Sequence, residues 1–260
     1  MLVNKIRSAL TELVAEEKVL VLDQVGSTME EVKQFQTALS KDSFLGVVVA
    51  LSQTAGRGRQ GREWISNPNA GVYLSAIFRF KVENLSSLGL LPLLVGLELK
   101  QRLEGFSNNL KLKWPNDLVV QTKDGVKKLG GLLLEATSEA DIATVVIGVG
   151  LNIRKVLLPN SISLEELGKN ANGNEHAQVS ALVLSSTIAA VNTLQSASKS
   201  EFVARYNSQM LFLNQQVTFI EGAGVTLSGV NRGIDIDGSL LLETSSGTIK
   251  LYSGEVHQGI

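Results

Sequence analysis

Gln53-Thr54-Ala55-Gly56-Arg57-Gly58-Arg59-Gln60-Gly61-Arg62-Glu63-Trp64 is the stretch around which the rest of the chain is organised. We call it the Gly/Arg loop (residues 53–64), because three glycines and three arginines stand within seven consecutive positions. An apolar run at residues 46–51 precedes it, and an alternating apolar run at residues 72–80 follows it. This arrangement predicts a long loop between two strands of one sheet.

The composition of the Gly/Arg loop predicts an anion-binding site. Glycine permits positive φ and close backbone approach, and arginine presents a rigid fork of donors for phosphate or carboxylate. The alternative is a solvated surface loop whose arginines pair with acids elsewhere. The density of glycines favours the binding site, because each glycine costs conformational entropy on folding and contributes no packing.

Composition and charge exclude several classes of function. The chain has 260 residues, with 24 basic and 25 acidic side chains and a net charge of −1. A general nucleic-acid binder usually carries a basic excess. The chain has no cysteine, which excludes disulfides, thiolate metal sites and a cysteine nucleophile. A histidine-based triad or metal site is not expected either, because His176 and His257 are the only histidines.

The chain is predicted to be cytoplasmic and not to span a membrane. Residues 1–18 lack the apolar core and cleavage site of a signal peptide. The longest apolar stretch identified, residues 88–99, contains Pro92 and Glu98 and is too short to cross a bilayer. The absence of cysteine agrees with a reducing compartment.

Hydrophobic periodicity predicts mixed helices and strands up to residue 213, followed by short strands alone. Helices are expected at residues 5–17, from a capping box at Ser27 or Thr28 to about 39, and at 85–103, 164–167, 179–195 and 200–211. Strands are expected at 19–22, 46–51, 72–80, 110–114, 118–121, 127–135 and 142–149. Further strands at 217–220, 225–233, 238–243 and 248–252 predict a small β-barrel or sandwich. We therefore expect two domains, residues 1–213 and 214–260.

A second motif, Lys113-Trp114-Pro115-Asn116-Asp117, places an amide and a carboxylate at the end of a strand. Asp117 is predicted to hold Mg²⁺ that bridges phosphates, and Asn116 to bind a nucleobase. The alternative is an ordinary Asx turn.

A third motif, Lys127-Lys128-Leu129-Gly130-Gly131, indicates that another group approaches the backbone closely beside an ammonium. The alternative is a bulge with a solvated lysine. A fourth motif, Gly148-Val149-Gly150-Leu151-Asn152-Ile153, ends a buried strand and is weak evidence by itself.

Taken in this order, the four motifs resemble those of the biotin–protein ligases, over nearly the whole chain from Ser27 onward. The resemblance implies an α+β fold, in which a mixed β-sheet covered by helices, related to class II aminoacyl-tRNA synthetases, precedes a small SH3-like β-barrel. It implies that ATP and Mg²⁺ activate biotin as biotinyl-5′-AMP. The biotin then passes to a lysine of the biotin carboxyl carrier protein of acetyl-CoA carboxylase. Members that also act as repressors carry a DNA-binding domain before the ligase domain. Only about two dozen residues precede Ser27, so a monofunctional ligase that binds no nucleic acid is expected.

The resemblance also implies roles for individual residues. Arg57 and Lys128 are expected at the carboxylate and phosphate of the intermediate, and Arg59 and Arg62 at the β- and γ-phosphates. Asp117 is expected near the metal or the incoming lysine, where a further hypothesis makes it the base. The other expected ligand residues are Ser27, Thr28 and Gln53 at the ureido ring, the backbone of Gly56, Gly58, Gly130 and Gly131, Trp64 at the apolar tail, and Asn116 and Asn152 near the adenine.

Two positions leave alternatives open. Met29 stands where many family members have asparagine, so it forms an apolar wall or biotin loses a contact. Lys127 lies beside Lys128, and the spacing to Gly130 favours Lys128 as the inward lysine.

Three other functions agree with part of the sequence. A lipoate–protein ligase shares the fold and the acyl-adenylate chemistry. A nucleic-acid-binding module is opposed by the neutral charge, and a non-catalytic biotin binder would not need Arg59, Arg62, Asp117 and Lys128 together.

The resemblance allows a weak homodimer through the sheet beside the Gly/Arg loop. The glycines of this loop predict a lid that is mobile without ligand and ordered over the adenylate.

Overall fold

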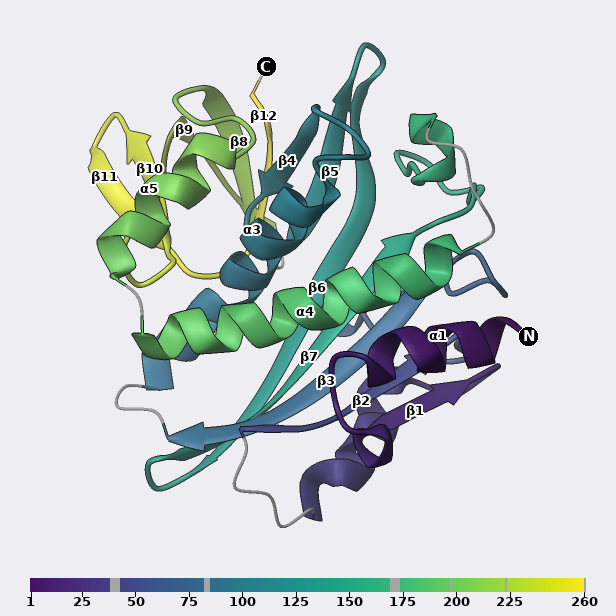
Figure 1. Cartoon of the computed structure of the whole chain (residues 1–260). Helices are drawn as coiled ribbons and strands as arrows, with labels where there is room; N and C mark the ends of the chain where they lie inside the picture. The colour runs from purple at the N-terminus through teal and green to yellow at the C-terminus, as the bar shows by residue number, and fades with distance from the viewer. Residues whose placement is uncertain (38–42, 82–84, 169–173, 197, 223, 260) are drawn as a thin grey trace.

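A seven-stranded mixed sheet forms the centre of the computed structural model (Figure 1), which describes residues 1–37, 43–81, 85–168, 174–196, 198–222 and 224–259. The strand order is β1 (Val19–Leu22), β2 (Phe44–Ala50), β3 (Gly71–Lys81), β7 (Ile142–Asn152), β6 (Gly125–Glu139), β5 (Asp117–Thr122) and β4 (Leu110–Lys113). Strands β1 and β2 are parallel, and each other neighbouring pair is antiparallel. The predicted mixed sheet is therefore confirmed.

Side-chain alternation along β3 gives the sheet two different faces. Val72, Leu74 and Phe78 belong to the main hydrophobic core, whereas Tyr73 and Ser75 point to the opposite face. On the core side the sheet is covered by α1 (Leu2–Thr11), α3 (Leu91–Leu103) and α4 (Glu175–Ser196), and α4 crosses the sheet (Figure 1).

The opposite face is only partly covered. Helix α2 (Thr28–Glu31) and the 3-10 helix that follows it (Val32–Thr37) pack there on a small cluster. Its buried members are Met29, Val32, Leu45, Val48, Ile77 and Val146. The Gly/Arg loop lies over the rest of this face, and a cavity remains between the loop and the sheet.

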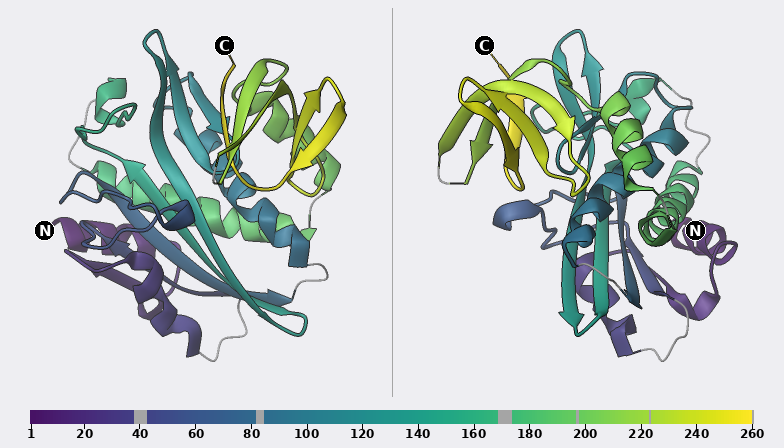
Figure 2. Two further views of the ribbon diagram at one scale, coloured as in Figure 1. Left: turned by 180° about the vertical axis from the view of Figure 1, so that it is seen from behind. Right: turned by 90° about the vertical axis from the view of Figure 1, so that its left-hand side faces the viewer.

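A second, five-stranded antiparallel sheet follows α5 (Lys199–Gln209). Its order is β11 (Gly247–Leu251), β10 (Leu240–Thr244), β9 (Val225–Ile234), β8 (Gln216–Glu221) and β12 (Glu255–Gln258). It stands at one end of the large sheet (Figure 2), where Trp114 Nε1 donates to the Gly238 carbonyl at 3.0 Å and the indole contacts the ring of Phe219. The expected barrel is thus an open sheet with β11 and β12 at its edges.

Several element boundaries differ from the prediction. The helix expected at residues 5–17 ends at Thr11, and a 3-10 turn follows at Glu16–Lys18. The helix expected at 85–103 begins as a 3-10 helix and becomes α-helical at Leu91, with Pro92 in its first turn, where proline is tolerated. Strand β12 was not predicted. The expected end of the helix near residue 39 lies outside the described residues.

Helix α4 is long and apolar enough to cross a membrane, which the sequence analysis overlooked. Half of its apolar window is buried, and the helix packs against α1, α3 and β3. These contacts account for its apolar composition, because a helix that is covered on several sides is hydrophobic around most of its surface.

Leu74 provides a test of the core that supports the site. Replacement of this fully buried side chain (Leu74→Ala) is expected to lower the free energy of unfolding by about 2–5 kcal/mol, because it removes apolar contacts and leaves a cavity. Urea denaturation measures the change. The matched control, Leu157→Ala at a 90% exposed position, is expected to change it by less than about 0.5 kcal/mol. Equal losses in the two variants would contradict the assignment of Leu74 to the core.

Candidate active site

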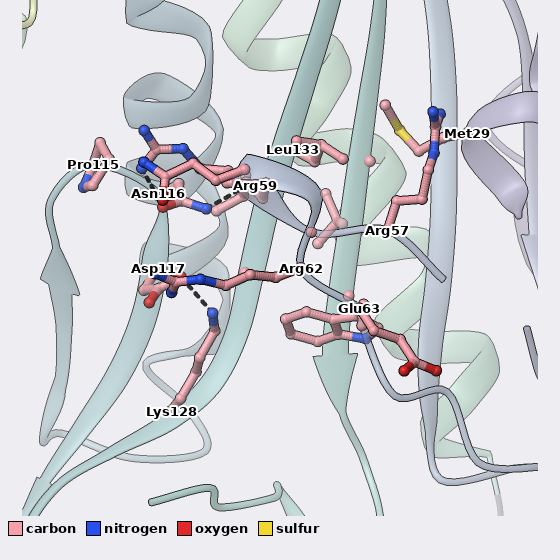
Figure 3. Close-up of a pocket in the computed structure, with 18 of the residues that line it drawn as sticks. Met29, Arg57, Arg59, Arg62, Glu63, Pro115, Asn116, Asp117, Lys128 and Leu133 are labelled. Atoms are coloured by element: carbon pink, nitrogen blue, oxygen red, sulfur yellow. Dashed lines mark hydrogen bonds and ion pairs between the residues drawn. The ribbon is translucent and has the colours of Figure 1, made fainter. Parts of the chain in front are cut away.

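A cavity of about 170 Å³ lies on the open face of the large sheet, under the Gly/Arg loop (Figure 3). Strands β3, β7 and β6 form its floor, and the turn between β4 and β5 and the second sheet form its end. The predicted site residues that line it are Thr28, Gln53, Arg57, Gly58, Arg59, Arg62, Trp64, Asn116, Asp117, Lys128 and Gly131. The structure thus brings together residues that are up to about a hundred positions apart.

Three glycines make the floor of this cavity, and bulky side chains rest on two parts of it. Gly131 on β6 and Gly150 on β7 are direct partners in the sheet, and a Cβ atom on Gly150 would lie 2.6 Å from Trp64 Nε1. A Cβ atom on Gly148 would overlap the sulfur of Met29. Met29 is buried and lines the cavity, where it forms an apolar wall.

A chain of hydrogen bonds occupies the end of the cavity near α2. Ser75 donates to Thr28 Oγ1 at 2.8 Å, and the Thr28 amide and hydroxyl both donate to Gln53 Oε1, at 2.9 and 3.1 Å. Gln53 Nε2 donates to Ser66 Oγ at 2.8 Å. Because each polar group has a partner, this end is a preorganised polar surface.

Cationic side chains gather at the other end, near β5 and the second sheet (Figure 3). Lys128 Nζ lies 2.7 Å from Asp117 Oδ1 and 5.1 Å from the centre of the Trp64 ring. Arg59 donates to the neutral Asn116 Oδ1 at 3.2 Å, and Arg62 pairs with Glu255 of β12. Burial lowers the pKa of Arg59, and the charges of Asp117 and Glu255 oppose this effect. The arrangement can offset the charge of a phosphate or carboxylate.

Arg57 is not part of this cationic end. Its guanidinium lies 2.6 Å from a carboxylate oxygen of Glu30 and 2.9 Å from one of Glu135. Figure 3 shows it on the Met29 side of the cavity, turned away from the Lys128–Asp117 pair. Arg57 and Lys128 therefore lie on different sides of the cavity, because two acids far from Arg57 in sequence hold its guanidinium. Arg57 and Arg62 thus pair with acids elsewhere in the chain, as the alternative interpretation of the loop expected.

Four predicted residues do not line the cavity: Ser27, Gly56, Gly130 and Asn152. The Asn152 amide donates to the Ile162 carbonyl at 3.1 Å, as a structural contact between segments. Gly130 faces the backbone of Gly150 across the sheet. The hydroxyl of Ser27 is buried and has no hydrogen-bond partner among the described residues, and it makes no helix-capping bond. The capping box predicted at Ser27 is therefore wrong, and the hydroxyl of Thr28 donates to Gln53 Oε1 instead of capping the helix.

Within the described part of the chain, no group of three or more His, Asp and Glu side chains is arranged to hold a metal ion. His176 is buried away from the cavity, 2.9 Å from the Asn69 carbonyl oxygen. Asp117 is one carboxylate already paired with Lys128. This donor set fits a Mg²⁺ that arrives on nucleotide phosphates, with Asp117 as a single protein ligand, because Mg²⁺ takes its other ligands from phosphate and water.

Sequence reasoning missed the acidic partners of the loop and two residues of the floor. Glu30, Glu135 and Glu255 pair with loop arginines, and Tyr73 and Ser75 line the cavity. The alternation at residues 72–80 puts Tyr73 and Ser75 on one face, but it does not indicate that this face lines a cavity. No local pattern marks the three glutamates.

Two family models match the chain. The model described as "Biotin/lipoate A/B protein ligase family" matches residues 21–152, and that described as "Biotin protein ligase C terminal domain" matches residues 212–257. The chain is 34% identical over 214 residues to the bifunctional ligase/repressor BirA of Escherichia coli. That alignment covers 79% of this chain and 64% of the relative, so the chain spans less than two thirds of this relative's length.

Two further relatives match over most of their length. A biotin–[acetyl-CoA-carboxylase] ligase of Mycobacterium tuberculosis is 30% identical over 244 residues, which is 91% of this chain and 87% of the relative. The solved structure of a biotin protein ligase from Aquifex aeolicus in complex with biotin and ATP superimposes with a TM-score of 0.71 at 30% identity. This match covers 93% of this chain and 98% of that one.

The contact between Trp64 and the glycine floor can be tested by a double-mutant cycle. Gly150→Ala is expected to lower the free energy of unfolding by about 1–3 kcal/mol, because the new methyl group overpacks against the indole. In a Trp64→Ala background the same change is expected to cost less than about 0.5 kcal/mol, because the clashing ring is gone. Urea denaturation of the four proteins measures the coupling. Equal costs in both backgrounds would show that Trp64 does not rest on Gly150.

Proposed function

Because this chain belongs to the biotin/lipoate A/B protein ligase family, we propose that it is a biotin–protein ligase. It joins biotin to ATP as biotinyl-5′-AMP and transfers the biotin to a lysine of the biotin carboxyl carrier protein of acetyl-CoA carboxylase. The match to a C-terminal domain model named for biotin protein ligases supports biotin over lipoate.

The observation that carries this proposal is the division of one cavity into a polar end, an apolar middle and a cationic end. Two strands, β7 and β6, lie between Ser75 on β3 and Asp117 on β5. The three strand-to-strand spacings amount to about 14 Å at the usual distance. Biotin has the same three parts in order, with a ureido ring, an apolar tail and a carboxylate. The Thr28–Gln53 pair then meets the ring, and the indole of Trp64 meets the tail.

In the first step an oxygen of the biotin carboxylate attacks the α-phosphorus of ATP. The new bond is a mixed anhydride, and the bond to the β-phosphate breaks to release pyrophosphate. Neither partner needs an enzyme nucleophile, so the protein's task is to hold two anions together and offset their charge. Lys128 and Arg59 are assigned to the carboxylate and α-phosphate, and Arg62 to the outer phosphates. Arg59 takes the place expected of Arg57, because Arg59 lies at the cationic end.

In the second step the amine of the acceptor lysine attacks the anhydride carbonyl, loses a proton, and AMP leaves. A lysine has a reference pKa of about 10.4, so roughly one in a few thousand is neutral at pH 7. Asp117 lies at the cationic end and accepts this proton as a general base. Lys128, at 2.7 Å, keeps the Asp117 carboxylate oriented toward the cavity. When bound with the nucleotide, Mg²⁺ supplies further charge neutralisation for the phosphates.

The proposal places the protein in the cytoplasm, where the acceptor carboxylase subunit acts. Packing of the apolar helix α4 into the core supports a protein that does not cross a membrane. The net charge of −1 supports a protein partner rather than nucleic acid. We further propose a weak homodimer that forms through the sheet beside the Gly/Arg loop. We also propose that the chain divides into two domains at residue 213.

Transfer of biotin can be measured directly by mass spectrometry. Incubation with biotin, ATP, Mg²⁺ and a biotin carboxyl carrier domain is expected to add one biotin mass to the carrier. Lipoate with its own carrier domain serves as the competing reaction. Modification of only the lipoate carrier would reverse the substrate assignment, and no modification of either carrier would refute the ligase proposal.

Removal of the base is expected to slow the second step selectively. Asp117→Asn is expected to lower the rate of single-turnover transfer from preformed biotinyl-AMP by about 10²-fold or more, the usual contribution of general base catalysis. The matched control is Asp124→Asn in the turn between β5 and β6, outside the cavity. A wild-type transfer rate for Asp117→Asn would exclude the base role.

A further inference from the structure

The three arginines of the Gly/Arg loop have different partners, and Arg57 is the one held by two carboxylates of the large sheet and α2. Arg57 pairs with Glu30 and Glu135, and Lys33 pairs with the same two acids at 2.9 and 3.2 Å. The four side chains thus form a closed ring in which positive and negative charges alternate. We call it the charge ring.

We propose that Glu135, together with Glu30, is a positioning residue that seats the Gly/Arg loop on β6 and keeps it closed over the adenylate, acting through Arg57. The inference rests on the proposed function for its catalytic consequences. The seating itself is a property of the free protein.

Strand β6 offers two seats for the loop on one face. Side chains alternate along a strand, so Gly131, Leu133 and Glu135 all point toward the cavity side. Trp64 rests on Gly131, where a Cβ atom would lie 3.0 Å from the indole, and Arg57 binds Glu135. The two seats are four residues apart, or about 13 Å along the strand. At its tryptophan end the loop is therefore held by the packing of Trp64 on Gly131, which has no side chain. At its arginine end it is held by the ion pair of Arg57 with Glu135.

The charge ring also connects the loop to the residues at the polar end of the cavity. Glu30 lies two residues after Thr28 on α2, and Thr28 binds Gln53 at the start of the loop. Hydrogen bonding from Lys33, followed by the charges of Arg57 and Lys33, outweighs the opposing desolvation and lowers the pKa of Glu30. Because α2 carries both Thr28 and Glu30, closing of the loop and alignment of the polar end are coupled.

The strength of the charge ring suits a lid rather than a permanent clamp. Arg57 and Glu135 are 36% and 34% exposed, and Glu30 is 53% exposed. Ion pairs at such exposure contribute little each and are weakened by salt. The loop can therefore open to admit biotin and close again, and loss of one carboxylate shifts this balance without unfolding the protein.

Limited trypsin digestion of the free protein tests the seating without any substrate. Glu135→Gln removes one charge of the ring and leaves the cleavage sites at Arg57, Arg59 and Arg62 intact. Cleavage in the loop is expected to be roughly threefold to fivefold faster than in wild type, the effect of losing one partly exposed pair. High salt is expected to raise the wild-type rate toward that of the variant. The matched control is Glu139→Gln, which removes the charge of an exposed glutamate at the end of the same strand. This variant is expected to be cleaved at the wild-type rate.

Kinetics of biotin transfer test the consequence for the reaction. In Glu135→Gln the KM for biotin and the share of biotinyl-AMP lost to solution are expected to rise roughly threefold to fivefold, with kcat less affected. Glu135→Asp is expected to restore part of the effect, because it restores the charge. A general loss of folding would instead lower kcat and thermal stability together and would not respond to salt.

The outcomes separate the two proposals. Wild-type cleavage rates in Glu135→Gln at low salt would overturn the seating, whether or not the protein transfers biotin. Faster cleavage with an unchanged KM and unchanged adenylate loss would overturn its role in the reaction. Absence of biotin transfer in the wild-type protein would refute only the proposed function.

Discussion

The contact on which the site depends is the packing of the Trp64 indole against Gly131 and Gly150. The indole can lie this close to the sheet only because neither position has a Cβ atom, and the two glycines are direct partners across β6 and β7. Close-packed interiors do not accommodate an added methyl group at such a distance. The glycine floor therefore sets the height of the Gly/Arg loop above the sheet, and with it the depth of the cavity.

The charges of the site are arranged around this floor. The loop brings three arginines to the open face, and each has a different kind of partner: two carboxylates for Arg57, a neutral amide for Arg59 and a carboxylate of the second sheet for Arg62. Only a cation that is not already neutralised by a carboxylate is fully available to a new anion. By this criterion the distribution favours Arg59 as the cation most available to an anion, whereas Lys128 and Arg62 are paired with Asp117 and Glu255. It also explains why the second sheet belongs to the site, since Glu255 reaches the loop from β12.

Much of the fold could be predicted from the sequence, because strand alternation is a local property. The pattern at residues 72–80 correctly placed β3, and glycine pairs marked where other groups approach the sheet closely. Errors arose where tertiary contacts decide the outcome. The first helix ends at Thr11 rather than near residue 17. Ser27 makes no capping bond, and its neighbour Thr28 binds Gln53 instead. Strand β12 is only four residues long and pairs with β8, which lies more than thirty residues earlier.

The sequence by itself determined the mixed α/β organisation, the two sheets, the glycine-rich loop and the set of polar residues from which the site is built. It determined them because hydrophobic period, turn residues and motif spacing are encoded by near neighbours in the chain. Only the tertiary structure decided which side chains face one another. Arg57 and Glu135, or Arg62 and Glu255, are so distant in sequence that their pairing depends on strand order and on the position of the second sheet. For that reason the sequence indicated a cationic site, and the structure showed which carboxylates pair with its cations.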